Sequence, residues 1–248
     1  MSAGAFRSDL FVGQVALVSG GTGGIGAAIG DALAACGARV TVTGATAEEA
    51  AAARARPDFR AREALPLDLR DSAAIASIIA RLPQLDIVVN AAGVIRRDAE
   101  HDPAVFADVV DINLTGAMRL CAAAHPLLEK SRGCIVNVTS MLAWFGGGRA
   151  PAYSASKGGL VQLTKSLAIA YARDRIRVNA VAPGWIVTPL TQALQDDHER
   201  SAAIVARTPL GRWGKAGDVA GTVVFLCSPA AEFVTGAIIP VDGGYLAA

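Results

Sequence analysis

The sequence is poor in charged residues, aromatic residues and cysteine, and each shortage excludes a class of protein. Only 18% of its 248 residues are charged, and 23 Lys and Arg against 22 Asp and Glu leave a net charge of +1. No run of like charge marks a surface for nucleic acid or another polyanion. The four cysteines lie far apart, without the paired spacing of a zinc site or the density of a disulfide scaffold. We expect buried thiols in a reducing compartment.

Long apolar runs and metal-ligand patterns are missing as well. No apolar run reaches the roughly 18 residues of a membrane-spanning helix, and the N-terminus lacks the basic segment and apolar core of a secretory signal. His101, His125 and His198 have no metal-ligand spacing. We therefore expect a soluble cytoplasmic protein that binds no nucleic acid, membrane or metal.

Apolar residues are plentiful, at 52%, and they occur as short β-branched runs that alternate with longer Ala-rich stretches. This alternation is typical of βαβ units around a parallel sheet, and runs that are apolar throughout indicate strands covered on both faces. We predict one α/β domain over residues 1–248, a Rossmann-like doubly wound parallel sheet of about seven strands with helices on both faces. The predicted strands are Val15–Ser19, Val40–Thr43, Ala64–Leu67, Ile87–Asn90, Cys134–Thr139, Arg177–Ala182 and Ile238–Val241. The predicted helices are 25–36, 47–55, 72–82, 103–130, 152–173 and 216–228, with Asp71 or Ser72, Asp102 and Asp218 as N-caps.

One segment does not fit the alternation. After Pro183, roughly thirty residues that include Trp185 and Trp213 precede the next clear helix. A long irregular segment inside a compact domain is usually functional, so we predict that residues 184–215 form a substrate-binding lid.

A glycine-rich turn, SGGTGGIG at 19–26, follows the first predicted strand. A strand that leads through such a turn into a helix forms a phosphate site, because the N–H groups at the helix start lack partners and the glycines let a pyrophosphate approach. The turn fits both G-x-G-x-x-G starting at Gly21 and G-x-x-x-G-x-G starting at Gly20, and the spacing alone does not choose between them. Either spacing predicts a dinucleotide site.

Tyr153 and Lys157 lie four residues apart, on one face of a predicted helix. Ser140 stands at the end of the strand that precedes this helix, at the sheet edge where ligands bind. Hydride transfer from an alcohol requires a base for the hydroxyl proton, and a free phenol with a pKa of about 10 is a poor base at neutral pH. A nearby ammonium favours the phenolate, and a serine hydroxyl can hold the substrate oxygen. The three residues predict an alcohol–ketone oxidoreductase.

These residues, with several others, resemble the short-chain dehydrogenase/reductase family. The resemblance extends from about Leu10 to Gly244, and its motifs stand in the family's order and spacing. The matching positions are the glycine turn at 19–26, Asp68-Leu69, Asn90-Ala91-Ala92-Gly93, Asn113, Ser140, Tyr153, Lys157, Pro183-Gly184 and Thr188. Two small departures are Ser19 in place of the family's usual Thr, and Ala91 in place of its second Asn.

The resemblance implies four catalytic roles. Tyr153 would be the general acid/base, and Lys157 would bind the nicotinamide ribose and lower the pKa of the tyrosine. Ser140 would orient the substrate carbonyl. Asn113 would hold the water that links Lys157 to solvent.

The resemblance also implies a cofactor site. Asp68 would bond the adenine amino group, with the Leu69 backbone beside it, and Asn90, Ala92 and Gly93 would sit under the adenosine ribose. Ile186 and Thr188 would hold the carboxamide. The full set of implied cofactor-binding residues is Gly20, Thr22, Gly24, Ile25, Gly26, Asp68, Leu69, Asn90, Ala92, Gly93, Tyr153, Lys157, Pro183, Gly184, Ile186 and Thr188.

The choice between NAD(H) and NADP(H) depends on the end of the second predicted strand. An acidic residue there accepts bonds from the ribose 2′-hydroxyl, whereas an arginine accommodates a 2′-phosphate. Residues 40–46 contain neither, and Gly23 stands where NADP-dependent relatives often have a basic residue. A phosphate without a cationic partner is held poorly, so the sequence favours NAD(H) over NADP(H).

For the substrate, the chain looks most like the 2-deoxy-gluconate 3-dehydrogenase and gluconate 5-dehydrogenase group of this family. Arg149 lies between Ser140 and Tyr153 in sequence, and a guanidinium can bind a carboxylate through two bonds. We therefore predict Ser140, Arg149 and Tyr153 as substrate-binding residues. Arg96 and Arg97 are equally compatible with substrate binding, surface solvation or subunit salt bridges.

Two alternatives stay open at this stage: a 3-oxoacyl-thioester (acyl-carrier-protein) reductase, and a non-catalytic dinucleotide sensor. The missing partner for a 2′-phosphate argues against the first, which normally uses NADPH. The complete catalytic set argues against the second. The resemblance further implies a homotetramer, and apolar surface on the helices predicted at 103–130 and 152–173 supports burial between subunits.

Overall fold

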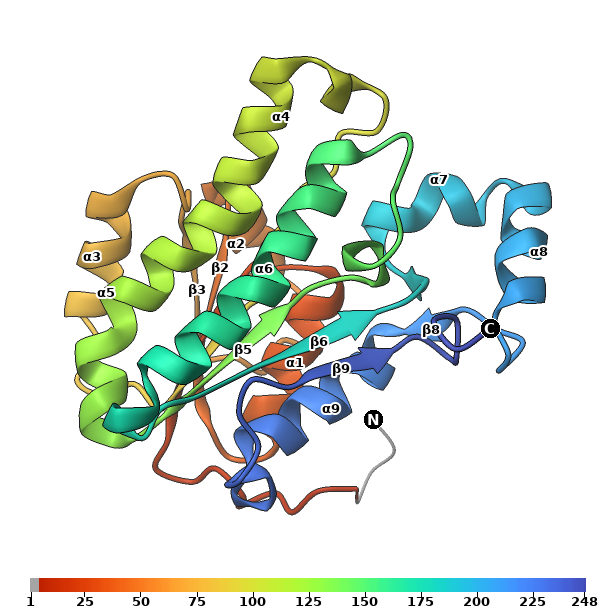
Figure 1. Cartoon of the computed structure of the whole chain (residues 1–248). Helices are drawn as coiled ribbons and strands as arrows, with labels where there is room; N and C mark the ends of the chain where they lie inside the picture. Colours follow the sequence, from red (N-terminus) through yellow and green to blue (C-terminus); the bar gives the residue numbers. More distant parts are fainter. Residues whose placement is uncertain (1–4) are drawn as a thin grey trace.

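Seven strands form one parallel sheet in the order β3-β2-β1-β4-β5-β6-β9, as the computed structural model shows for residues 5–248 (Figure 1). The order reverses between β1 and β4, since β1 pairs with β2 on one side and with β4 on the other. Ligands bind at the carboxyl ends of the strands beside such a reversal. The predicted doubly wound sheet is confirmed, with strands β1 (Val15–Ser19), β2 (Arg39–Gly44), β3 (Glu63–Pro66), β4 (Ile87–Asn90), β5 (Cys134–Val138), β6 (Arg177–Pro183) and β9 (Ile238–Val241).

Helices cover both faces of this sheet, and each face has its own apolar core. Side chains of α1, α2 and α9 pack against one face, and those of α3, α5 and α6 against the other. All four cysteines are buried and free. The helices are α1 (Gly24–Ala35), α2 (Ala47–Arg54), α3 (Ser72–Ala80), α4 (Pro103–Val110), α5 (Gly116–Ser131), α6 (Pro151–Ala170) and α9 (Ala216–Cys227).

The helix predicted at 103–130 is interrupted. A π-helical turn, Asp111–Thr115, separates α4 from α5, and it places Asn113 in the interior at 1% exposure. Such turns add one residue to the helix and are frequent at functional sites. The apolar periodicity runs across the interruption, which is why the sequence pattern did not reveal it.

The prediction that residues 184–215 are irregular was wrong. The segment contains β7 (Ile186–Val187) and β8 (Gly214–Lys215), which pair in parallel, and two helices, α7 (Gln192–Gln195) and α8 (His198–Arg207). Helix α8 buries only Ile204, but its apolar and polar residues are segregated to opposite faces, a helical pattern that the sequence analysis overlooked. Figure 1 shows α7 and α8 together at one side of the sheet, beyond the ends of the strands.

Two of the three predicted caps are confirmed. Asp71 caps α3 and Asp102 caps α4, each accepting two backbone N–H bonds. Asp218 is instead the third residue of α9, where it accepts a bond from the Lys215 backbone at 2.8 Å. Short helical turns complete the described chain: η1 (Ala99–His101), η3 (Met141–Ala143), η4 (Ala172–Asp174), η5 (Pro189–Thr191) and η6 (Pro229–Ala231). Within residues 5–248, none of the helices has the length and apolar character needed to cross a membrane.

Candidate active site

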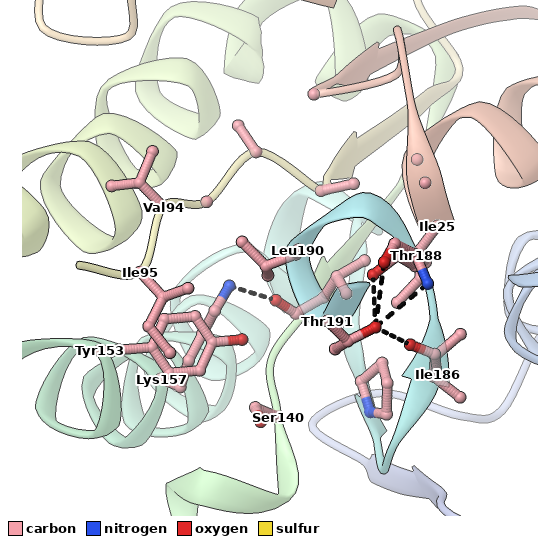
Figure 2. Close-up of a pocket in the computed structure, with 18 of the residues that line it drawn as sticks. Ile25, Val94, Ile95, Ser140, Tyr153, Lys157, Ile186, Thr188, Leu190 and Thr191 are labelled. Carbon is pink, nitrogen blue, oxygen red and sulfur yellow. Dashed lines mark hydrogen bonds between the residues drawn. The ribbon is translucent and has the colours of Figure 1, made fainter. Parts of the chain in front are cut away.

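A cavity of about 1140 Å³ opens at the carboxyl ends of the central strands. It is lined by the glycine turn, by the segments that follow β4 and β5, by the start of α6, and by residues of the 184–215 segment. Its volume is slightly above the usual range of about 300–1,000 Å³ for small-molecule sites, which suits a dinucleotide together with a substrate. Figure 2 shows Tyr153 and Lys157 on one side of this cavity, Ile186, Thr188 and Thr191 on the other, and Ser140 below, between the two groups.

The glycine turn is tightly packed, and this packing decides which glycines matter. Gly20 has a φ of +68°, and a Cβ there would lie 2.5 Å from the Ala92 backbone. A Cβ on Gly26 would lie 2.1 Å from the Gly20 carbonyl oxygen. Gly24 has a φ of +54°, whereas a Cβ on Gly23 would meet nothing within 4 Å, so the backbone requires glycine at position 24 of the G-x-x-x-G-x-G spacing but not at position 23 of the other. Gly23 gives α1 no side-chain cap, so the first N–H groups of the helix stay available for an anion such as a pyrophosphate.

Ser140, Tyr153 and Lys157 lie together on the cavity lining. Ser140 follows β5 and caps η3, accepting a bond from the Leu142 backbone at 3.2 Å. Lys157 Nζ donates to the Val138 carbonyl at 2.9 Å and lies 5.5 Å from the centre of the Tyr153 ring. Both side chains project from the first turns of α6, because four residues are about one helical turn.

Burial sets the proton affinities of this pair. It raises the pKa of Tyr153, against opposing effects from a Ser140 hydrogen bond and the Arg97 charge, while the Glu100 carboxylate adds to the rise. It also lowers the pKa of Lys157 to about 8, because an ammonium loses its water there. The direction at Tyr153 is opposite to the expectation that Lys157 lowers its pKa, because burial outweighs the charges around the phenol in this structure.

Asn113 is held by a complete set of hydrogen bonds. Its Oδ1 accepts from the Val94 N–H at 2.8 Å, and its Nδ2 donates to the Val94 carbonyl at 2.9 Å and to Ser156 Oγ at 3.1 Å. Gly93 keeps space between Asn113 and Lys157, since a Cβ there would lie 3.2 Å from Lys157 Nζ. Asn113 thus ties the segment after β4 to the helix that bears the tyrosine.

Of the cofactor-binding residues implied by sequence, all but Asn90 line the cavity. Asn90 points instead into the protein, where its Nδ2 donates to Asn137 Oδ1 at 2.8 Å. Asn90 is 3% exposed and joins β4 to β5, so its position corrects the expectation that it contacts the adenosine ribose.

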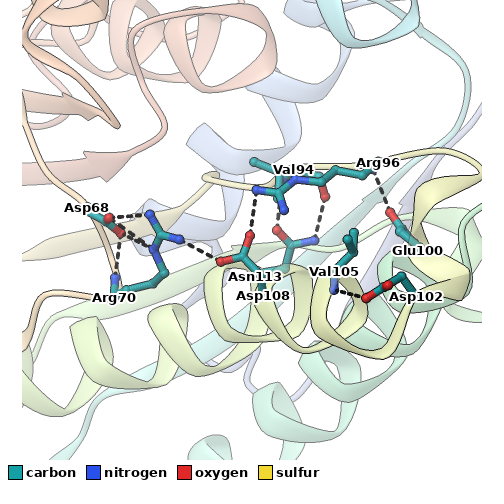
Figure 3. Close-up of polar contacts among 9 residues, drawn as sticks. All are labelled: Asp68, Arg70, Val94, Arg96, Glu100, Asp102, Val105, Asp108 and Asn113. Carbon is teal, nitrogen blue, oxygen red and sulfur yellow. Dashed lines mark hydrogen bonds and ion pairs between the residues drawn. The ribbon is translucent and has the colours of Figure 1, made fainter.

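Asp68 is part of an ion-pair network that the sequence did not reveal (Figure 3). Arg70 binds Asp68 at 2.7 Å and Asp108 at 2.7 Å, and Asp108 also binds Arg96 at 2.6 Å. The Arg70 bonds hold the pKa of Asp68 below its usual value. The network connects residues from three separate segments, and nothing local in the sequence pairs them.

Arg149 lines the cavity, as expected for a substrate-binding residue, but its charge has a partner. Its guanidinium makes two bonds to the Asp98 carboxylate, one of them 2.8 Å long, and both side chains are exposed. Asp98 lowers the net charge that Arg149 presents to an anion.

Arg207, on α8, is a cavity-lining cation that the sequence analysis missed. Its guanidinium lies 4.2 Å from the centre of the Tyr245 ring and 4.9 Å from that of Phe145. It makes no salt bridge with any residue in 5–248. Two aromatic rings from distant segments therefore hold an unpaired guanidinium at the cavity, an arrangement that cation–π attraction stabilises.

Glu49, also missed, lies at the adenosine end of the expected cofactor site. It belongs to α2, and its Oε2 accepts from the Ala45 N–H at 2.8 Å. A Cβ on Gly44 would lie 2.7 Å from the same Oε2 and 2.6 Å from Thr22 Oγ1. The helix thus brings a carboxylate back to the end of β2, where residues 40–46 contain none.

A phosphate-binding turn and a Ser–Tyr–Lys set at the carboxyl edge of one parallel sheet define an oxidoreductase that acts on CH–OH groups with a nicotinamide cofactor. The chain belongs to the short-chain dehydrogenase/reductase family, since residues 20–246 match the family model described as enoyl-(acyl carrier protein) reductase. It is 39% identical over 241 residues to 2-dehydro-3-deoxy-D-gluconate 5-dehydrogenase of Bacillus subtilis, covering 94% of this chain and 95% of that protein. It is 41% identical over 250 residues to cis-4-hydroxycyclohexanecarboxylate dehydrogenase of Sinomonas cyclohexanicum, covering 96% and 99%.

The fold is also similar to a solved gluconate 5-dehydrogenase from Burkholderia cenocepacia, a structure in complex with NADP and tartrate. The TM-score is 0.89 at 33% identity, covering 97% of this chain and 98% of that chain.

Proposed function

We propose that this protein is a sugar-acid dehydrogenase, which interconverts a secondary alcohol and a ketone in a sugar acid, a keto-deoxy sugar acid or a related polyol. The main support is the Ser140–Tyr153–Lys157 set beside a cavity that also presents an unpaired guanidinium. The Bacillus subtilis and Sinomonas cyclohexanicum relatives also support a substrate with a carboxylate, because each is named for a compound that has both a hydroxyl group and a carboxylate.

The chemistry follows from the positions of three side chains. In oxidation, the Tyr153 oxygen takes the proton of the substrate hydroxyl as hydride leaves the carbon that bears this hydroxyl. In reduction, Tyr153 gives a proton to the carbonyl oxygen as hydride is added to the carbonyl carbon. The Ser140 hydroxyl holds the substrate oxygen as charge develops on it. Lys157 supplies a cation beside the phenol and donors for the ribose. A nicotinamide cofactor accepts or supplies the hydride.

A substrate panel tests this proposal. Absorbance at 340 nm is followed with NAD or NADP against sugar acids, the matching polyols and acetoacetyl thioesters. We expect the highest kcat/KM with a sugar acid. A preference for the thioester would instead favour the acyl-carrier-protein reductase alternative, and no turnover with any of them would favour a non-catalytic sensor.

We further propose that Arg207 binds the substrate carboxylate. Arg207→Gln is expected to raise KM for the sugar acid by a factor of about 10 to 100, and to change KM for the matching polyol by less than about threefold. Arg207→Lys should recover only part of the loss, because an ammonium cannot reproduce the planar two-bond contact.

Arg149→Gln, measured in parallel, distinguishes the two arginines. If Arg149→Gln shows the acid-selective rise in KM and Arg207→Gln does not, the carboxylate anchor is Arg149, as predicted from the sequence. An equal rise in KM for both the acid and the polyol would show that the substituted arginine supports the cavity and does not bind the charge.

For the cofactor we propose a preference for NAD(H): Glu49 supports it, whereas the NADP in the similar gluconate 5-dehydrogenase structure argues for the other cofactor. A carboxylate at the end of β2 repels a 2′-phosphate and can accept a bond from a 2′-hydroxyl. Glu49→Gln retains an acceptor for the Ala45 N–H, so we expect the ratio of NADPH to NADH dissociation constants to fall by about tenfold, or about 1.4 kcal/mol. Fluorescence titration measures both constants.

Glu48→Gln is the matched control, because Glu48 is the neighbouring carboxylate on α2 and lies outside the cavity lining. An unchanged ratio in Glu49→Gln, or the same change in both variants, would remove the assignment to Glu49.

We propose a homotetramer as the assembly. Exposed apolar side chains on α4, α5 and α6 support it, with Phe106 37%, Met118 36% and Ile169 80% exposed. Light scattering at micromolar concentration should give about four times the chain mass of 25.3 kDa. A mass equal to one chain would refute the proposal.

A further inference from the structure

Glu100 is a buried carboxylate beside the catalytic helix. It lies in η1, between β4 and α4, and is 1% exposed. A carboxylate is expensive to bury unless hydrogen bonds or a cation compensate it. Within residues 5–248 it has no salt bridge, so its compensation comes from backbone N–H groups.

The two carboxylate oxygens bind two different segments. Oε1 accepts from the Arg96 N–H at 2.7 Å, in the segment after β4 that lines the cavity with Val94, Ile95 and Arg97 (Figure 3). Oε2 accepts from the Tyr153 N–H at 2.8 Å. One side chain therefore joins a side of the cavity to the residue that holds the reacting phenol.

The bond to Tyr153 also caps α6 in part. The N-cap residue of this helix, Ala150, makes no side-chain cap, and one open N–H of the first turn is bound by a residue 53 positions away. The positive end of the helix stabilises the buried charge. Asp71 and Asp102, by contrast, cap α3 and α4 from the adjacent position, so the cap of α6 by a distant residue differs from these two.

We infer that Glu100 is a positioning residue for Tyr153: it fixes the first turn of α6 against the 94–97 segment and thereby sets where the phenol stands in the cavity. The inference rests on the proposed dehydrogenase function. Tyr153 is in the first turn, so a movement of that turn displaces its oxygen directly, and displacements near 1 Å at a reacting group can lower rates about 100-fold.

Glu100→Gln tests the inference, because the amide keeps the size of the side chain but has only one oxygen. One of the two N–H groups then faces an NH₂ group and loses its acceptor. We expect kcat per NADH-binding site to fall by about 10 to 100-fold, while the dissociation constant for NADH changes by less than about threefold. Counting sites by NADH titration removes any unfolded fraction from the comparison.

Asp86→Asn is the matched control. Asp86 accepts from the Val15 N–H at 2.7 Å, at the start of β1 and on the opposite edge of the sheet. This carboxylate-to-amide change is expected to lower the thermal midpoint and to leave kcat per site unchanged. If Glu100→Gln behaves in the same way, with wild-type kcat per site, Glu100 is merely structural and the inference is wrong.

Glu100→Asp is the second test of the inference, for use if Glu100→Gln does not fold. It keeps the charge but is one methylene too short to span both N–H groups, so we expect a smaller loss of kcat per site, and wild-type kcat would overturn the inference. In each comparison, kcat per site of the variant is divided by kcat per site of the wild type, with whichever secondary alcohol the wild type oxidises as substrate. If the wild type oxidises secondary alcohols but no sugar acid, the proposed substrate class is wrong, and the ratio of kcat values still tests the role of Glu100.

Discussion

Tyr153→Phe is expected to lower kcat by at least about 100-fold while the dissociation constant for NADH changes by less than about threefold. The phenylalanine ring packs in the same place, but no group remains to carry the hydroxyl proton. Tyr153 is partly buried in the cavity lining, and phenylalanine keeps its ring there but has no hydroxyl to take up or return the proton. Steady-state kinetics and NADH fluorescence give the two quantities.

Tyr171→Phe is the control for the same chemical change. Tyr171 lies at the other end of α6, against His125, and outside the cavity lining. This variant should retain wild-type kcat. If Tyr153→Phe keeps more than about a tenth of the activity, Tyr153 is not the general acid/base.

Lys157→Met is expected to abolish most turnover, weaken NADH binding and yet stabilise the fold at pH 7. Burial lowers the pKa of Lys157 from 10.5 to about 8. At neutral pH Lys157 is charged in both states, and its ammonium is less stable in the folded chain than in the unfolded chain, where water solvates it. A methionine removes this cost but leaves the Val138 carbonyl without its donor. The net gain should be about 1–2 kcal/mol in the free energy of unfolding.

The gain in the free energy of unfolding from Lys157→Met must decrease as the pH rises. Between about pH 8 and 10.5 the unfolded wild type binds more protons than the folded form, so wild-type stability from this group rises with pH. The advantage of Lys157→Met should therefore shrink between pH 7 and 9.5 in urea unfolding. A difference that is equal at both pH values would contradict a lowered pKa at Lys157, and unchanged NADH binding would contradict its role at the ribose. Lys165→Met, at an exposed position of the same helix, controls for the added methionine.

Much of the architecture was predictable from the sequence because its causes are local. The seven strands are short apolar runs, and burial on both faces requires that pattern. The glycine turn after β1 and the four-residue spacing of Tyr153 and Lys157 are likewise local, since one turn and one helical repeat fix their geometry. The carboxyl ends of parallel strands share an edge, so Ser140 could be placed beside them without a structure.

The remaining features depend on contacts between distant segments, and these only the tertiary structure decided. Arg149 was a plausible free cation until Asp98 proved to be its partner, whereas Arg207 is held by rings from two other segments. Glu100 reaches the Tyr153 N–H only because η1 and α6 pack together, whereas its other donor, the Arg96 N–H, is four residues away in the sequence. The spacing of apolar residues within one helix or strand shows which of its faces packs against the core. Which charged groups pair across elements depends on how the elements pack, and that packing sets the electrostatics of the site.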